Sequence, residues 1–110
     1  MKIKEQLFST DTVTINYAEG PASGPPLVLL HGGSGRWQAF ESIMPELAQD
    51  WRLYAPDLRG HGKSGRAAGR YRLQDYTDDM IAFFGQRVME PAVVFGHSLG
   101  GMVALLLAAQ

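Results

Sequence analysis

A serine between two glycines, in the pattern Gly96-x-Ser98-x-Gly100, constrains this chain more than any other stretch. The apolar run Ala92–Phe95 precedes the pattern, and a second run, Met102–Ala109, follows it. A buried strand, a sharp turn and a helix form the setting in which a serine is held in a strained backbone conformation. Such packing leaves no room for a Cβ atom two residues before or after the serine, and only glycine avoids that clash. The pattern therefore predicts a strand–turn–helix unit with Ser98 at its turn.

The chemistry of such a turn follows from its position. The Ser98 hydroxyl is expected to stand exposed above the strand ends, with its backbone at a helix N-terminus. Free N–H groups and the helix dipole at that terminus favour a developing negative charge. A second interpretation is a turn that only joins a strand to a helix, because the pattern alone has low specificity.

Length and composition limit what the rest of the chain can be. With 110 residues, the chain forms one domain at most. The formal net charge of −1, with acidic and basic residues interspersed, predicts neither a nucleic acid nor an anionic membrane as partner. The absence of cysteine excludes disulfides and thiol chemistry. Because the sequence starts without the apolar core of a signal peptide and has no run long enough to span a bilayer, we expect a cytoplasmic protein.

The first thirty residues are typical of strands and turns. Ile3–Phe8 is predicted to be a strand, and Thr12–Tyr17 alternates apolar with polar residues as a half-buried strand does. We expect these two strands to form a hairpin. Glu19–Pro26 carries two glycines and three prolines and is predicted to be a loop. Leu27–Leu30 is apolar throughout, which suits the buried centre of a parallel sheet.

Helical and strand patterns alternate over the remaining residues. Apolar residues recur at helical spacing from Trp37 to Leu47, where Pro45 either kinks the helix or begins a second short one. The last predicted helix is apolar nearly all round, so we expect it to be buried. The further elements expected after Leu47 are a strand at Trp51–Ala55, a helix at Leu73–Val88, a strand at Ala92–Phe95 and a helix at Leu99–Gln110.

This alternation predicts an α/β fold. Strands that alternate with helices form a mostly parallel sheet flanked by helices on both faces, here led by an antiparallel N-terminal hairpin. Ligands bind at the carboxyl ends of the strands in such sheets. Three loops rich in Gly, His and Ser leave those ends, at residues 31–36, 57–65 and 96–98. We therefore expect any functional site where these loops meet.

Three motifs in these loops resemble those of the α/β-hydrolase fold family. They are His31-Gly32-Gly33, the stretch Asp57-Leu58-Arg59-Gly60-His61-Gly62-Lys63-Ser64, and Gly96-His97-Ser98-Leu99-Gly100-Gly101. Their order and spacing match the family, and the likeness runs from Ile3 to Gln110. The set is typical of the esterase, lactonase, perhydrolase and carbon–carbon hydrolase branches. The resemblance implies that residues 1–110 form the N-terminal part of one such domain, through the nucleophile turn and the helix after it.

The resemblance implies roles for particular residues. Ser98 matches the nucleophile of a serine hydrolase that acts on a small-molecule ester or lactone through an acyl-enzyme, with no cofactor and no metal. The Leu99 N–H matches one oxyanion donor, and the second is expected from the Gly33 N–H, with the Ser34 N–H as the other choice. A serine at position 98 argues against the haloalkane dehalogenase and epoxide hydrolase branches, which resemble this sequence elsewhere but use an aspartate there.

The three histidines have different expected roles. His31 is either a general base or, as the family pattern favours, a structural residue whose ring is hydrogen-bonded to backbone and so fixes the oxyanion loop. His97 is expected to project away from Ser98 and to be structural or pocket-lining. His61 is expected to belong to a turn network with Asp57, Arg59 and Ser64. Trp37 and Phe40, at helical spacing, are expected in the core rather than in an acyl pocket.

The sequence departs from the family pattern after the nucleophile. A serine–histidine–acid triad in this fold runs in the chain order serine, acid, histidine. No Asp, Glu or His occurs in the twelve residues after Ser98. We therefore expect a truncated enzyme, a fragment or one part of a split protein, with little hydrolysis of p-nitrophenyl acetate. The strand at 92–95 is expected to have an unpaired edge, which favours self-association or pairing with a missing C-terminal part.

Two hypotheses from other functional classes stay open. The first is a non-catalytic binding or assembly module of the same fold, which the missing triad members favour. The second is a nucleotide-binding module, since Gly62-Lys63-Ser64 is similar to the end of a phosphate-binding loop. That motif requires a glycine at position 57, where the sequence has an aspartate whose carboxylate would repel phosphate.

Overall fold

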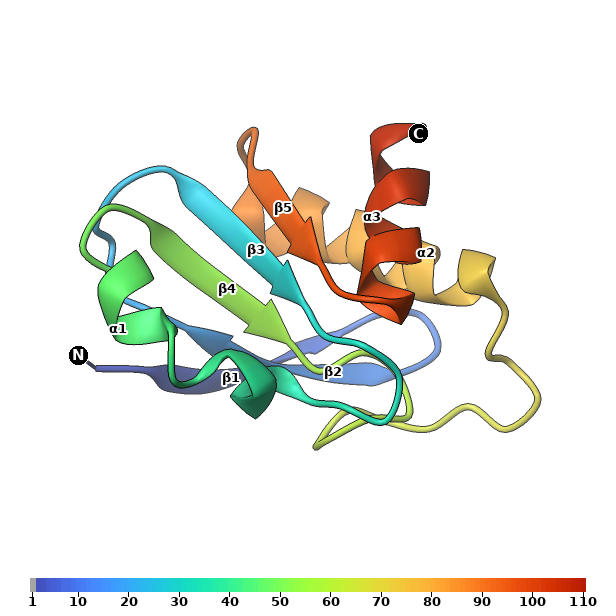
Figure 1. Cartoon of the computed structure of the whole chain (residues 1–110). Helices are drawn as coiled ribbons and strands as arrows, with labels where there is room; N and C mark the ends of the chain where they lie inside the picture. Colours follow the sequence, from blue (N-terminus) through green and yellow to red (C-terminus); the bar gives the residue numbers. More distant parts are fainter. Residues whose placement is uncertain (1) are drawn as a thin grey trace.

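The computed structural model describes residues 2–110 as a five-stranded sheet with short and long helices around it (Figure 1). The chain begins with three strands and then forms two short helices and a fourth strand. A long helix, a fifth strand and a last helix complete it. The elements are β1 (Lys4–Ser9), β2 (Thr14–Glu19), β3 (Pro26–Leu30), η1 (Trp37–Phe40), α1 (Met44–Leu47), β4 (Arg52–Pro56), α2 (Leu73–Phe83), η2 (Phe84–Val88), β5 (Val93–Gly96) and α3 (Leu99–Ala108).

The strands lie in the order β1-β2-β4-β3-β5. β1 and β2 form the predicted antiparallel hairpin, and β2 also runs antiparallel to β4. β3 pairs in parallel with β4 on one side and with β5 on the other. The α/β class is confirmed. The sheet is mixed, with two parallel and two antiparallel pairs, because the hairpin joins it through β2. All five residues of β3 are buried, as its continuous apolar sequence predicts.

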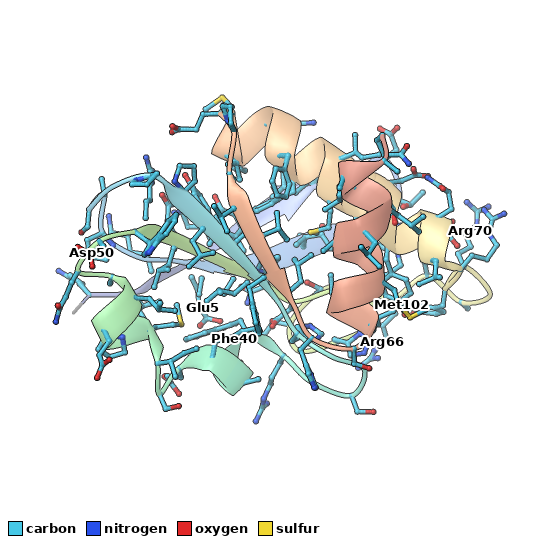
Figure 2. The ribbon with its side chains drawn as sticks, turned by 45° about the horizontal axis from the view of Figure 1, so that its top comes forward. Glu5, Phe40, Asp50, Arg66, Arg70 and Met102 are labelled. Atoms are coloured by element: carbon cyan, nitrogen blue, oxygen red, sulfur yellow. The ribbon has the colours of Figure 1, made fainter. Side chains whose placement is uncertain are left out.

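Each face of the sheet has its own apolar core. On one face, side chains of α2, η2 and α3, among them Met80 and Phe83, pack on Tyr17 and Val28 of the sheet. On the other face, Trp37, Phe40 and Met44 of η1 and α1 pack on Leu29 and Leu53. Figure 1 shows these helices on opposite sides of the sheet, and Figure 2 shows Glu5 and Phe40 on the side of η1 and α1. Trp37 and Phe40 are therefore core residues, as expected.

Two helical predictions are refined by the structure. The pattern from Trp37 to Leu47 forms two short helices, and Pro45 lies in the first turn of the second. This arrangement is the second of the two alternatives, because proline lacks the N–H that a helix interior requires. The pattern from Leu73 to Val88 is continuous helix, but its last five residues form a wider π-type turn that ends at Met89 in the left-handed region.

The half-buried alternation predicted for Thr12–Tyr17 is wrong at Asn16 alone. The strand begins at Thr14, and the predicted inner face (Val13, Ile15 and Tyr17) is buried while Thr12 and Thr14 are exposed. Asn16, expected on the open face with the two threonines, is buried. Its amide instead donates to Glu5 and to Asp57, at 3.0 and 3.1 Å, so burial leaves its N–H groups bonded.

The burial predicted for the last helix is also wrong. Within residues 2–110, only Gly100 and Val103 of α3 are buried. Leu105 is 74% exposed and Met102 is 48% exposed. The helix packs on α2 and β5 along one side, and no described residue covers the other. An apolar sequence shows that burial of the helix would be favourable, but it does not show that another element is present to cover it.

β5 forms an edge of the sheet in the part of the chain that the structure describes. Its only partner is β3, and the side chains of Val93 and Phe95 are each about half exposed. This confirms the expected unpaired edge. Beside it, a cavity of about 670 Å³ lies between α2, β5 and α3 and is lined mostly by apolar side chains, including Phe84, Val94 and Leu107.

Two polar clusters hold the loops to the sheet. The Glu5 carboxylate on β1 accepts hydrogen bonds from Lys63, Asn16 and the Trp37 indole, and these bonds lower its pKa to about 2. Arg59 is buried and forms a forked pair with the buried Asp79 of α2, with N···O distances of 2.7 and 2.8 Å. Arg59 also donates to the Arg70 carbonyl and to Thr12.

The buried pair makes Asp79 a sensitive position. We expect Asp79→Asn to lower the free energy of unfolding by about 3–5 kcal/mol, because it leaves the Arg59 charge buried without a counter-charge. The matched control is Asp78→Asn on the same helix, where the carboxylate is exposed and the change is expected to be within about 0.5 kcal/mol. Urea unfolding followed by circular dichroism measures both. Equal effects of the two substitutions would contradict this account of the pair.

Candidate active site

Ser98 lies at the turn between β5 and α3 with φ 54° and ψ −113°, outside the regions that L-residues usually occupy. Its side chain is exposed, and α3 begins at the next residue. The predicted strand–turn–helix unit with an unusual serine backbone is therefore present. Backbone strain of this kind persists only where the surrounding structure holds it in place.

The two glycines explain how the turn closes. A Cβ atom on Gly96 would lie 2.3 Å from the Gly100 carbonyl oxygen. A Cβ atom on Gly100 would lie 2.2 Å from the carbonyl oxygen of Leu30, at the end of β3. Both distances are far below van der Waals contact. The expected requirement for glycine at these positions is confirmed.

Hydrogen bonds seat the turn on the end of β3. The His97 N–H donates to the Leu30 carbonyl at 3.0 Å, and the Gly100 N–H donates to the His31 carbonyl at 3.1 Å. Loop 31–36 and the serine turn therefore meet at one edge of the sheet, as expected from the parallel pairing of β3 with β5. His97 itself is exposed, and its ring lies against Gly32, where a Cβ atom would be 2.7 Å from Nδ1.

Loop 31–36 contains a tight turn with free donors. The Gly35 N–H donates to the Gly32 carbonyl at 3.0 Å, and Ser34, at the third position of this turn, has φ 63°. Among residues 2–110, no acceptor is hydrogen-bonded to the N–H groups of Gly33 and Ser34, nor to that of Leu99. Gly33 is exposed, and a Cβ atom there would meet nothing within 4 Å. Both sides of the site therefore present unused backbone donors.

The His31 ring is fully buried and bonded at both nitrogens. Nδ1 lies 2.7 Å from the Gly32 carbonyl oxygen, and the Leu58 N–H donates to Nε2 at 3.0 Å. Burial lowers its pKa below the usual value of 6.5, partly offset by the bond to Gly32. The structural interpretation of His31 is confirmed, because a ring with both nitrogens engaged by backbone has none free to serve as a base.

Loop 57–65 is organised by the buried Asp57 carboxylate. It accepts from the Trp37 N–H at 2.7 Å and from the Lys63 N–H at 3.0 Å. The Ser64 hydroxyl donates to the Asp57 carbonyl, and His61 Nδ1 lies 2.9 Å from the Arg59 carbonyl oxygen. The expected turn network is therefore present, with the ring of His61 5.0 Å from that of His31.

These same bonds disfavour phosphate binding at Gly62-Lys63-Ser64. The Lys63 N–H is used by Asp57, its ammonium group pairs with Glu5, and the Ser64 hydroxyl is used by the Asp57 carbonyl. A phosphate-binding loop needs those donors free. In addition, Gly62 has φ 52°, and a Cβ atom there would meet the Asp57 carboxylate at 2.3 Å. Glycine is therefore required at position 62 by the geometry of the turn around Asp57, and not by a phosphate.

The site has no partner for the Ser98 hydroxyl in the part of the chain that the structure describes. No side chain of residues 2–110 is hydrogen-bonded to it, and no three His, Asp or Glu side chains are grouped so as to hold a metal ion. Sequence reasoning missed the contributions of Glu5 and Asn16, which fix the floor of loop 57–65. Little in the local sequence indicates these contacts, because each residue is a single polar residue in a predicted strand.

The strain at Ser98 can be measured. We expect Ser98→Gly to be more stable than Ser98→Ala by about 1–3 kcal/mol, because glycine adopts this conformation without a Cβ clash. The control pair is Ser9→Gly and Ser9→Ala in β1, where glycine is expected to be less stable by about 0.5–1 kcal/mol. Thermal or urea unfolding of the four variants checks this. A Ser98→Gly variant less stable than Ser98→Ala would show that the turn is unstrained.

Comparison with known proteins adds two similar sequences. The chain is 37% identical over 110 residues to the AB hydrolase superfamily protein YfhM of Bacillus subtilis, covering 96% of this chain and 38% of that protein. It is 41% identical over 90 residues to the magnesium-chelatase 30 kDa subunit of Rhodobacter capsulatus, covering 81% of this chain and 32% of that protein. The chain thus spans between three and four tenths of the length of these relatives.

A solved structure and a family model agree with these matches. The N-acyl homoserine lactonase AidH superposes with a TM-score of 0.91 at 35% identity, over 98% of this chain and 41% of that one. No helix within residues 2–110 combines the length and apolar character needed to cross a membrane. The family model for the alpha/beta hydrolase fold matches residues 25–110, which include all three loops of the site. On this evidence the chain belongs to the α/β-hydrolase fold family.

Proposed function

We propose that this chain supplies the nucleophile and the oxyanion donors of a serine hydrolase that acts on a small-molecule ester or lactone. The observation that carries the proposal is the backbone of Ser98, strained at φ 54° and exposed at the start of α3. Strain costs stability, so it is kept where it serves a site. The family match and the similarity to a lactonase support the reaction class.

The proposed reaction begins when Ser98 Oγ attacks the substrate carbonyl carbon. As the Oγ–C bond forms, the carbonyl electron pair moves to its oxygen and the hydroxyl proton passes to a base. The N–H groups of Leu99 and Gly33 are proposed to donate to that oxyanion, each worth about 3 kcal/mol of transition-state stabilisation. As this intermediate collapses, the bond to the leaving oxygen breaks and that oxygen takes the proton back from the base, which releases the alcohol or opens the lactone ring. The acyl-enzyme that remains is hydrolysed by water.

We propose that the general base, and the carboxylate that orients it, come from residues outside this 110-residue sequence. No side chain in residues 2–110 is hydrogen-bonded to Ser98 Oγ, and the two nitrogens of His31 are engaged by backbone. A serine without a base is a weak nucleophile. We therefore propose that this chain by itself acylates slowly and turns over poorly.

A second candidate is a non-catalytic binding or assembly module of the same fold. The similarity to a protein named as a chelatase subunit favours it. The exposed β5 edge and the uncovered side of α3 also suit association, either with another copy or with a C-terminal complement. The two candidates differ in one property, which is whether Ser98 reacts selectively.

Selective phosphonylation separates the two candidates. We expect a p-nitrophenyl alkylphosphonate to form one adduct per chain at Ser98, because oxyanion donors and binding alone leave about 10³–10⁴-fold catalysis when a triad is incomplete. Intact-mass and peptide mass spectrometry locate the adduct. Ser98→Ala is expected to abolish it, and Ser23→Ala, at an exposed loop serine, is the matched control that keeps it.

Turnover is the second readout of this experiment. We expect no more than slow hydrolysis of p-nitrophenyl acetate by the 110-residue chain. Labelling spread evenly over exposed serines would favour the assembly module. Rapid turnover abolished by Ser98→Ala would show that a base exists within the chain.

A further inference from the structure

Glu5 of β1 and Asp57, directly after β4, accept hydrogen bonds from the same three residues. The Asn16 amide donates to Glu5 at 3.0 Å and to Asp57 at 3.1 Å. Trp37 donates its indole N–H to Glu5 at 3.0 Å and its backbone N–H to Asp57 at 2.7 Å. Lys63 donates its ammonium group to Glu5 at 2.9 Å and its backbone N–H to Asp57 at 3.0 Å. These five residues form one connected network, which we call the two-carboxylate cluster.

The two-carboxylate cluster joins the hairpin strands to two loops of the site. Glu5 lies on the side of the sheet that η1 and α1 cover (Figure 2). Trp37 comes directly after loop 31–36, and Lys63 lies within loop 57–65. The first of these loops leaves β3 at one end, so the cluster fixes it at the other end.

The middle of that loop has no side-chain packing to hold it in place. Gly33 is exposed, and a Cβ atom there would meet nothing within 4 Å. The bonds next to it are both on the Gly32 carbonyl, which accepts from the Gly35 N–H at 3.0 Å and lies 2.7 Å from His31 Nδ1. These bonds set the shape of the turn, whereas its distance from the serine turn depends on where the loop ends. A displacement of Trp37 is therefore expected to reach the Gly33 N–H.

Glu5 is the acceptor for the side-chain donors of the cluster. Trp37 is 6% exposed, and within residues 2–110 its indole N–H has Glu5 as its one acceptor. Without the Glu5 carboxylate, this N–H and one N–H of the buried Asn16 amide lose their acceptor. A buried donor without an acceptor is unfavourable, so either water must enter or the Trp37 ring must move. Because this ring is part of the core on its face of the sheet, its movement would displace the start of η1.

The two oxygens of the Glu5 carboxylate differ in importance. Oε2 accepts from Trp37 and Asn16, which are both buried. Oε1 accepts from Lys63, whose side chain is 67% exposed. An exposed ion pair contributes little to stability, and salt screens it. We therefore expect Trp37, and not Lys63, to transmit the effect of Glu5 to the site.

We propose that Glu5 is a positioning residue of the site, which holds the end of loop 31–36 through the Trp37 indole and so places the Gly33 N–H beside Ser98. This inference rests on the function proposed above. Glu5 does not touch the reacting atoms, because it acts through the Trp37 side chain. An outer strand of the sheet thereby contributes to the oxyanion site.

The first test measures the rate of Ser98 phosphonylation in two variants of Glu5. We expect Glu5→Leu to slow the reaction about tenfold, because a misplaced donor stabilises the oxyanion less. Glu5→Gln is expected to recover most of that loss, because its amide oxygen can take the place of Oε2 and accept from Trp37 and Asn16. Equal rates in these two variants would contradict a role that depends on the indole bond.

The matched control is Glu19→Leu in β2. The Glu19 carboxylate also accepts from an amide and from a cation, which are the side chains of Gln6 and Arg52. Neither partner belongs to a loop of the site. Glu19→Leu is therefore expected to lower stability and to leave the phosphonylation rate unchanged.

A double-mutant cycle tests whether Glu5 acts through Trp37. Trp37→Phe keeps an aromatic ring in the core but removes the indole N–H, so it is expected to slow phosphonylation by a similar factor. If the indole bond transmits the effect, the chain with both Glu5→Leu and Trp37→Phe reacts no more slowly than the slower single variant. Effects that multiply would show that the two residues act independently, which would overturn the proposal.

Nuclear magnetic resonance of ¹⁵N-labelled chain follows the bond and the donor separately. We expect the Trp37 indole proton to move upfield in Glu5→Leu and to keep its position in Glu5→Gln, with the Trp51 indole as internal reference. The Gly33 amide signal is expected to move in Glu5→Leu but not in Glu19→Leu. A Gly33 signal that ignores Glu5→Leu would refute the positioning role.

The outcomes distinguish this inference from the function on which it rests. A folded Glu5→Leu chain that is labelled at Ser98 at the original rate refutes the role of Glu5 and leaves the proposed function standing. An unsubstituted chain without selective labelling at Ser98 refutes the proposed function and this inference with it. If Glu5→Leu does not fold, Trp37→Phe decides, because the original rate in that variant refutes the proposal.

Discussion

The contact of Gly100 with the end of β3 is the constraint on which the site depends. The Gly100 N–H donates to the His31 carbonyl, and there is no space for a side chain between Gly100 and the Leu30 carbonyl. This close approach seats the N-terminus of α3 on the strand end, together with the contact of Gly96 with the Gly100 carbonyl and the bond from the His97 N–H to Leu30. Ser98 lies between these contacts in its strained conformation, and Leu99, as the first residue of α3, keeps its N–H free.

Paired buried polar groups hold the loops around this contact in place. Asp57 holds the start of η1 and the turn at Lys63, and Arg59 ties the same loop to α2 through Asp79. Burying these groups unpaired would cost free energy, so the observed arrangement is favoured because it satisfies them. The His31 ring connects the loop after β4 to the loop after β3, because it accepts from the Leu58 N–H and contacts the Gly32 carbonyl oxygen.

The sequence alone predicted those elements whose packing restricts which residue types can occupy them. Glycines at 96 and 100 record a space with no room for a Cβ atom, and the apolar run of β3 records burial on both faces. The partners of Asn16 lie in distant segments, so its burial left no local signal. One side of α3 is exposed although burial was predicted, because an apolar pattern does not show whether a covering element is present. The direction of the Gly33 N–H is a backbone property that no side chain reports.

We propose that the free N–H groups of Gly33 and Leu99 converge on one oxyanion position above Ser98. A crystal structure of the phosphonylated chain tests it most directly, since the phosphoryl oxygen occupies the place of the oxyanion. We expect this oxygen to lie about 2.7–3.1 Å from both nitrogens, with the phosphorus bonded to Ser98 Oγ. A phosphoryl oxygen that faces solvent, with neither nitrogen within hydrogen-bond distance, would contradict it.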